Sequence, residues 1–134
     1  MSYGSAITLK EPFDHVVESV RAGLAAQGFG VLTEIDVQAT MKTKLDADLD
    51  PYVILGACNP PLAYRALQAD PSLGMLLPCN VVVRGTVDGT VVEAVDPMMM
   101  IGASGNPELQ PIADEAAGRL QAVMTSLSAA AGRD

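Results

Sequence analysis

Two runs rich in β-branched residues flank Asp88-Gly89 in the second half of the chain. The first is Asn80-Val-Val-Val-Arg84 and the second is Thr90-Val-Val-Glu-Ala-Val95. Asp-Gly between such runs is a strong signal of a β-hairpin, because Asp and Gly tolerate the positive φ that tight hairpin turns demand. A hairpin commits the chain to an antiparallel sheet, and the apolar face of that sheet must be covered by a second layer.

Strand and helix patterns alternate upstream of the hairpin. Short strands are predicted at 7–9, 31–36 and 52–55, the second of them alternating like a half-buried strand. Gly28 is predicted to end the first helix in the left-handed conformation. That helix carries apolar residues at helical spacing, namely Phe13, Val16, Val17, Val20 and Leu24.

Asparagine and aspartate mark the starts of the other predicted helices. Asp36 is expected to cap a short helix with Val37, Met41 and Leu45 on one face. Asn59-Pro60 and Asn106-Pro107 each combine an N-cap with a proline at the first helical position. The helix after Asn59 is expected to end at Asp70-Pro71, with an apolar connector at 73–78 and a soft Met-rich patch at 98–101. The last helix is expected to bury Leu109, Ile112, Ala113, Ala116, Leu120, Val123, Met124 and Leu127.

The predicted order is strand, helix, strand, helix, strand, helix, hairpin, helix. This order favours an α+β fold, a two-layer α/β sandwich with a mainly antiparallel sheet and helices packed on one face. The length of 134 residues fits a single domain spanning 1–134. We expect its core to span about 5–128, with 129–134 frayed at the C-terminus.

The charge of the chain excludes several classes of partner. Sixteen acidic residues against eight basic ones give a net charge of −8, and the basic residues are scattered. Nucleic acids and anionic membranes attract concentrated basic surfaces, so neither is predicted as a partner. No apolar run approaches the ~20 residues that span a bilayer, and the N-terminus lacks the pattern of a signal peptide. The expected location is the cytoplasm, where both cysteines would be free thiols.

Hydrophobic residues make up 49% of the chain, and the mean hydropathy is +0.28. A domain of this size buries only about two thirds of the surface of its unfolded chain. Part of the apolar excess is therefore expected on the surface, where a large patch usually marks an interface. We interpret the excess as the contact of a homodimer; the alternative is a well-filled core with scattered surface alanines.

The two cysteines lie at the ends of apolar runs, beside asparagines and prolines. Cys58 precedes the Asn59 cap, and Cys79 precedes Asn80 at the start of a strand. The candidate ligand-binding residues are Cys58, Asn59, Cys79 and Asn80, with Tyr64 in the helix that follows. The thiols have three interpretations: buried structural residues, a reactive or redox pair near a helix N-terminus, or weak candidate metal ligands. Their spacing is unlike Cys-x-x-Cys, and no catalytic residue is predicted.

Other polar clusters have simpler interpretations than a site. His15 is expected on the solvated face of the first helix, with neither a metal nor a haem. Glu34 and Asp36 alternate onto one strand face and could form an acid–base pair if buried, but a polar outer strand face and a helix cap are the preferred interpretation. The acidic turn with Asp46, Asp48 and Asp50 lacks the Gly and terminal Glu of a calcium loop. The loop 102–107 lacks the Lys of a phosphate-binding loop.

Four blocks in order resemble the family called domain of unknown function 302. They are Gly28-Phe-Gly-Val-Leu-Thr-Glu-Ile-Asp-Val37, Ile54-Leu-Gly-Ala-Cys-Asn-Pro-Pro-Leu-Ala63, Leu76-Leu-Pro-Cys-Asn-Val81 and Ala94-Val-Asp-Pro97, and the resemblance spans roughly residues 5–128. It implies a small α/β fold, typically a homodimer, without an established enzymatic activity. It also implies a histidine in many relatives where this chain has Tyr64, so an imidazole near Cys58 is absent here.

Together these observations predict a small cytoplasmic homodimeric module that binds a small ligand near Cys58 and Cys79. The alternative is a thiol-dependent redox or metal-handling protein that uses the same two cysteines. No cofactor is predicted, and the absence of a recognisable catalytic set argues against an enzyme.

Overall fold

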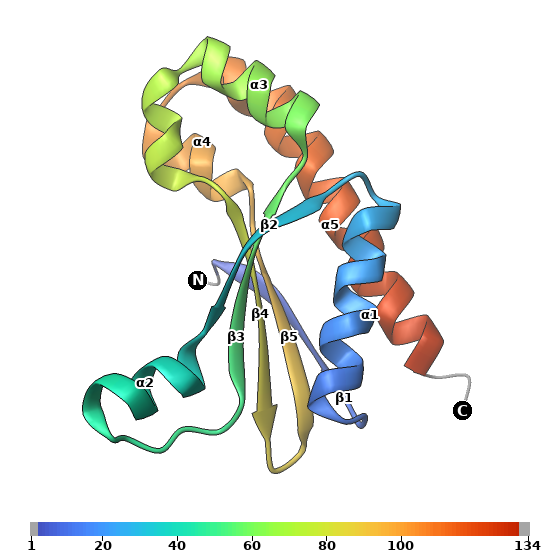
Figure 1. Cartoon of the computed structure of the whole chain (residues 1–134). Coiled ribbons are helices and arrows are strands. Elements are labelled where there is room, and N and C mark those ends of the chain that lie inside the picture. Colours follow the sequence, from blue (N-terminus) through green and yellow to red (C-terminus); the bar gives the residue numbers. More distant parts are fainter. Residues whose placement is uncertain (1–2, 132–134) are drawn as a thin grey trace.

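The fold is built on a five-stranded sheet in the order β1-β5-β4-β3-β2 (Figure 1). The structure is a computed structural model, and it describes residues 3–131. The strands are β1 (Gly4–Leu9), β2 (Gly30–Asp36), β3 (Tyr52–Cys58), β4 (Cys79–Thr86) and β5 (Gly89–Val95). Every neighbouring pair is antiparallel. The predicted antiparallel sheet is therefore confirmed.

The predicted hairpin joins β4 to β5, with Thr86 opposite Gly89. The two turn residues are Val87 and Asp88, one position earlier than predicted. The Thr86 hydroxyl explains this shift, because it accepts a hydrogen bond from the Asp88 amide (3.2 Å) and donates one to the Gly89 carbonyl (2.9 Å). Gly89 alone supplies the positive φ, +138°, as the first residue of β5.

Two helices cover one face of the sheet (Figure 1): α1 (Phe13–Ala26) and α5 (Gln110–Ala131). The main hydrophobic core lies between them and the strands. The expected stripe of α1 is buried at Val16, Val17, Val20 and Leu24, and Gly28 follows the helix with a φ of +81°. All eight apolar residues predicted for the last helix are buried, with Leu109 in the turn before α5. The α+β prediction is confirmed.

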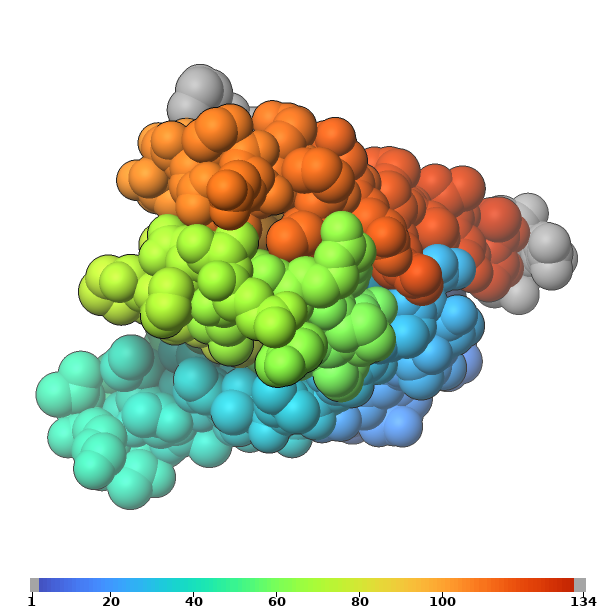
Figure 2. Space-filling model, turned by 90° about the horizontal axis from the view of Figure 1, so that it is seen from above, coloured from blue at the N-terminus to red at the C-terminus, as the bar shows by residue number. Residues whose placement is uncertain are grey.

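A second hydrophobic cluster lies at one end of the sheet. It gathers α3 (Pro60–Ala69), η1 (Pro71–Leu76), α4 (Met98–Ser104), η2 (Pro107–Leu109) and the first turns of α5. The sequence predicted an apolar connector where η1 forms and an apolar patch where α4 forms. Both segments are short helices. Leu73 and Met100 are buried in this cluster, and their burial explains why these segments are ordered. From above (Figure 2), α3 and η1 form a band between α4–α5 and the segment from α1 to α2.

The helix α2 (Val37–Leu45) projects from the body of the molecule (Figure 1). Asp36 caps it as predicted, because its carboxylate accepts a hydrogen bond from the Ala39 amide at 2.9 Å. No residue of α2 is buried, and Leu45 is 71% exposed. The strand before it, β2, is also mostly exposed, so the expectation of a half-buried strand was wrong: β2 is an edge strand.

The C-terminal helix is longer than the sequence indicated. α5 continues to Ala131, although fraying was expected from 129. The rest of the predicted frayed tail, 132–134, lies outside the described residues. Within the described chain, no helix is long and apolar enough to cross a membrane.

Candidate functional site

A cavity of about 360 Å³ lies where the two hydrophobic clusters meet. Phe29, Ala57 and Cys79 contribute to it from the main core, and the second cluster contributes from α3, α4 and α5. Its volume is at the lower end of the range for small-molecule pockets. The residues that line it are Phe29, Leu32, Thr33, Ala57, Cys58, Asn59, Leu62, Ala63, Ala66, Leu67, Gly74, Leu77, Pro78, Cys79, Met100, Ile112 and Ala116.

The sheet brings the two cysteines to this cavity from neighbouring strands. Cys58 is the last residue of β3 and Cys79 is the first residue of β4. Cys79 pairs with Ala57, so the two cysteines are one residue apart in register. Both are free and partly buried. The convergence of the two cysteines therefore results from strand register, which sequence spacing does not reveal.

An irregularity in β2 shapes the wall opposite α3. The register of β2 against β3 shifts between Val31 and Thr33, which leaves Leu32 without a partner. Regular strands place consecutive side chains on opposite faces, and a bulge redirects them. Leu32 and Thr33 consequently both line the cavity.

Gly56 permits a close approach at the same wall. A Cβ at this position would overlap the Thr33 hydroxyl and lie 2.8 Å from Pro78 Cγ. Thr33 lies on β2 and Pro78 directly precedes β4, the two strands that flank β3 in the sheet, and both residues line the cavity. A side chain at position 56 would therefore push apart two lining residues.

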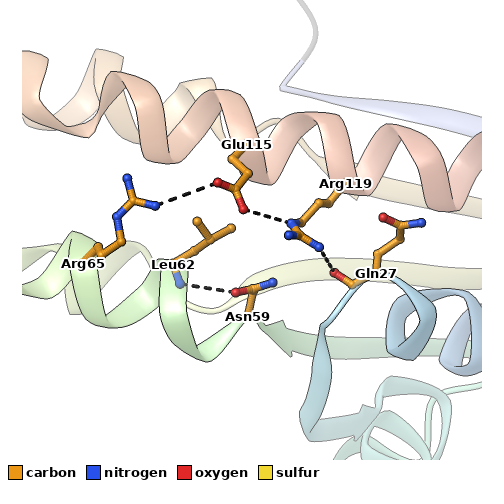
Figure 3. Close-up of polar contacts among 6 residues, drawn as sticks. All are labelled: Gln27, Asn59, Leu62, Arg65, Glu115 and Arg119. Atoms are coloured by element: carbon orange, nitrogen blue, oxygen red, sulfur yellow. Dashed lines mark hydrogen bonds and ion pairs between the residues drawn. The ribbon is translucent and has the colours of Figure 1, made fainter.

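Asn59 joins the cavity to the helix α3. Its side-chain oxygen accepts a hydrogen bond from the Leu62 amide at 3.3 Å, as the predicted cap requires (Figure 3). The residue is buried, and its Nδ2 lies 3.0 Å from the position of a Cβ on Gly28. Asn59 thus supplies an amide to the cavity wall while it fixes the start of α3.

A chain of polar contacts ties α3, α5 and the end of α1 together (Figure 3). Arg119 donates a hydrogen bond to the Gln27 carbonyl oxygen at 3.0 Å and another to Glu115 at 3.1 Å. Glu115 also lies 3.9 Å from Arg65 on α3. These groups are partly exposed, so each ion pair is worth little on its own. Their effect is geometric, because they connect the helices that carry the cavity walls.

The cavity wall is almost entirely hydrocarbon and sulfur. None of its lining residues carries a formal charge at neutral pH. Burial raises the pKa of the Cys79 thiol, and the neighbouring Cys58 raises it further. Cys79 is therefore a neutral thiol at neutral pH. This protonation disfavours Cys79 as a nucleophile, because the thiolate is the reactive form.

The structure places the predicted ligand-binding residues in two groups. Cys58, Asn59 and Cys79 line the cavity together. Tyr64 is 66% exposed on α3 and is not part of the lining. Asn80 is exposed and lines a different concavity, on the uncovered face of the sheet beside Tyr52 and Glu93. The side chains of Cys79 and Asn80 separate because consecutive residues of a strand point to opposite faces.

Other polar residues that the sequence singled out have partners within the protein. His15 is mostly exposed and lies 2.9 Å from Glu11. Glu34 forms an ion pair with Arg21, and Asp36 is the α2 cap, so the two carboxylates do not form a buried acid–base pair. In the acidic turn, Lys42 contacts Asp46 at 2.8 Å and Asp48 at 3.2 Å.

Most of the lining was missed by sequence reasoning. Phe29, Ile112 and Ala116 carry no local signal beyond core periodicity, and the bulge at Leu32 has no recognisable motif. In the Met-rich patch at 98–101, Met100 is both buried and part of the lining. Among the described residues, no group of three or more His, Cys, Asp or Glu side chains could hold a metal ion.

Comparisons with known proteins agree with this architecture. A family model described as domain of unknown function DUF302 matches residues 5–127. The crystal structure of an uncharacterized conserved DUF302 protein from Bacillus stearothermophilus is similar to this chain, with 30% identity and a TM-score of 0.85. The alignment covers 92% of this chain and 96% of that one. No curated protein matches. The chain therefore belongs to the family described as domain of unknown function DUF302.

Proposed function

We propose that this protein is a small cytoplasmic homodimeric module that binds a small apolar or weakly polar ligand in the cavity beside Cys58 and Cys79. The observation that carries the proposal is the cavity itself, about 360 Å³ with a nearly all-apolar wall. A concave apolar pocket with a few polar groups is the usual form of a small-molecule site. The wall has few polar groups, at Thr33 on β2 and at the Cys58-Asn59 end of β3.

A cavity-filling variant tests the binding function. Ala63 is half-buried in the cavity wall, so Ala63→Phe should fill the cavity without overpacking the core. We expect the wild type to bind the neutral fluorophore 6-propionyl-2-(dimethylamino)naphthalene saturably and with one site per chain. Ala63→Phe should lose this binding, whereas Ala22→Phe, on an exposed position of α1, should retain it. Equal binding by all three proteins, or by none, would refute the proposal.

The homodimer is supported by surface that a single chain leaves uncovered. Leu32 and Ile35 on β2, and Leu45 and Leu49 in and after α2, are all exposed. We call these four residues the β2–α2 surface. A nine-residue helix that buries no residue is shorter than the ~12–15 residues at which isolated helices become even marginally stable. A second copy that covers this surface would stabilise both α2 and the edge strand.

A charge substitution on this surface tests the dimer. Ile35→Lys should convert a species of twice the chain mass of 13.9 kDa into a monomer, measured by size exclusion with light scattering. Met75→Lys is the matched control, because Met75 is 84% exposed but lies on η1. A wild-type protein that is monomeric at micromolar concentration would exclude the dimer.

A thiol-dependent redox or metal-handling function is the second candidate. It is favoured by the placement of both cysteines in one cavity, at the ends of neighbouring strands. This function predicts a stoichiometric metal in the purified protein, or a reactive thiolate whose titration changes in Cys58→Ser. Elemental analysis and the pH dependence of alkylation measure the two. A metal-free protein with two unreactive thiols would exclude this redox or metal-handling function, and ligand binding would be the remaining candidate.

A further inference from the structure

We propose that the ligand of this cavity is an uncharged molecule of roughly ten to fifteen carbon atoms, elongated or bicyclic, with at most one hydrogen-bonding head group. This inference rests on the proposed binding function and specifies the class of molecule that the cavity accepts. The three supporting observations are the absence of charge in the wall, the volume, and the position of the few polar groups.

The wall offers no partner for a charged ligand. The lining contains apolar residues, two thiols, one amide and one hydroxyl, without a basic or acidic side chain. The polar contacts in Figure 3 do not change this, because Arg119 contacts Gln27 and Glu115 and does not line the cavity. Transferring an unpaired ion into such a wall is costly. Ligands that would bury a charge in the cavity, such as nucleotides, sugar phosphates, amino acids and carboxylates, are therefore disfavoured.

The volume limits the size of the ligand. An engineered cavity of about 150 Å³ lined by apolar side chains holds one benzene molecule. The cavity here is more than twice that volume, at about 360 Å³. It therefore holds roughly ten to fifteen carbon atoms by the same measure. A larger hydrocarbon would extend past Leu32 and Leu67, which are exposed residues of the lining.

The polar groups define where a head group would bind. The oxygen of Asn59 accepts a hydrogen bond from the Leu62 amide, and its Nδ2 lies against Gly28, 3.0 Å from where a Cβ would be. The other polar group of the wall outside the two thiols is the Thr33 hydroxyl. A hydroxyl suits one neutral hydrogen-bonding group, such as an alcohol or a carbonyl oxygen. The rest of the ligand would contact hydrocarbon and sulfur.

Competition between molecules that differ only in head-group charge tests this inference. The protein is loaded with 6-propionyl-2-(dimethylamino)naphthalene, and decanol, decanoate and decylamine are titrated as competitors at pH 7.5. Decanol should displace the probe at a concentration at least tenfold lower than either charged analogue. Among neutral alcohols from six to ten carbons, each added methylene should strengthen competition about fourfold.

The outcomes separate the ligand class from the binding function. If the probe binds and Ala63→Phe abolishes binding, but decanoate or decylamine competes as well as decanol, the uncharged class is wrong and the binding function stands. If the probe does not bind the wild type at all, both fail. Leu67→Trp provides a second blocking variant on an exposed lining position, in case Ala63→Phe does not fold. Weakened probe binding in Leu67→Trp, with an unchanged circular dichroism melt, would support the cavity as the site.

Discussion

Asn59 has two roles that meet at one side chain: it caps α3 and forms part of the cavity wall. Asn59→Ala removes the acceptor of the Leu62 amide in a buried position, so we expect a loss of about 1–2 kcal/mol in the free energy of unfolding. Urea denaturation measures this loss. Asp36→Ala removes an equivalent cap at the exposed start of α2 and should cost about 0.5 kcal/mol. Equal losses in the two variants would show that burial does not strengthen the Asn59 cap.

Cys79 makes the stability depend on pH on the alkaline side. Its pKa is raised in the folded protein by burial and by Cys58, whereas an unfolded chain releases a cysteine proton near pH 8.5. The unfolded state then binds fewer protons than the folded state, so the free energy of unfolding falls as the pH rises above about 8.5. Below that pH the contribution of Cys79 is fully present. Urea denaturation under reducing conditions at pH 7.5 and pH 9.5 measures the fall.

Cys79→Ser is the matched variant for this pH effect, because serine has no proton to release in that range. The alkaline loss of stability should be smaller in Cys79→Ser than in the wild type, whatever the substitution costs at pH 7.5. An identical loss in both proteins would mean that other groups cause it. Each protein is compared with itself at pH 7.5 and pH 9.5, so the packing cost of the substitution cancels.

At the scale of elements, local signals predicted most of the fold. The stripe of α1, the Asn59-Pro60 start of α3 and the β4–β5 hairpin are encoded within a few residues, and the structure contains all three. The seven-residue helix α4 was not predicted, because it is too short for a helical period to emerge and contains a glycine. The bulge in β2 was also invisible, since it depends on the register of β2 against β3. Elements stabilised by distant contacts were therefore the ones that sequence reasoning missed.

The helix α2 should reveal its partner through hydrogen exchange. In a single chain its amides are protected only by a nine-residue helix without buried residues, so they should exchange almost as fast as those of an unfolded peptide. In the wild-type dimer they should be protected at least tenfold more than in Ile35→Lys. Amides of α1, which lies in the main core, should exchange at similar rates in both proteins. Unprotected α2 amides in a wild-type dimer would place the dimer contact elsewhere.

At the scale of the whole molecule, α5 connects the two hydrophobic clusters. Its first turns contribute Ile112 and Ala116 to the second cluster, and its later turns contribute Leu120 and Val123 to the main core. The cavity lies at the junction, so its walls depend on both clusters. The sequence predicted the apolar face of α5 but could not show that the face is shared, because helical periodicity does not identify the partner of each turn.

This shared helix predicts that both clusters unfold together. Leu73 is buried in the second cluster, far along the chain from α5, and Leu73→Ala should cost about 2–5 kcal/mol through the cavity that it creates. If α5 couples the clusters, Leu73→Ala should lower the urea midpoint of the whole molecule in one transition. Circular dichroism and exchange protection of the strands should then report the same midpoint. A biphasic transition, in which the strands keep the wild-type midpoint, would show that the second cluster unfolds on its own and that the cavity opens without loss of the sheet.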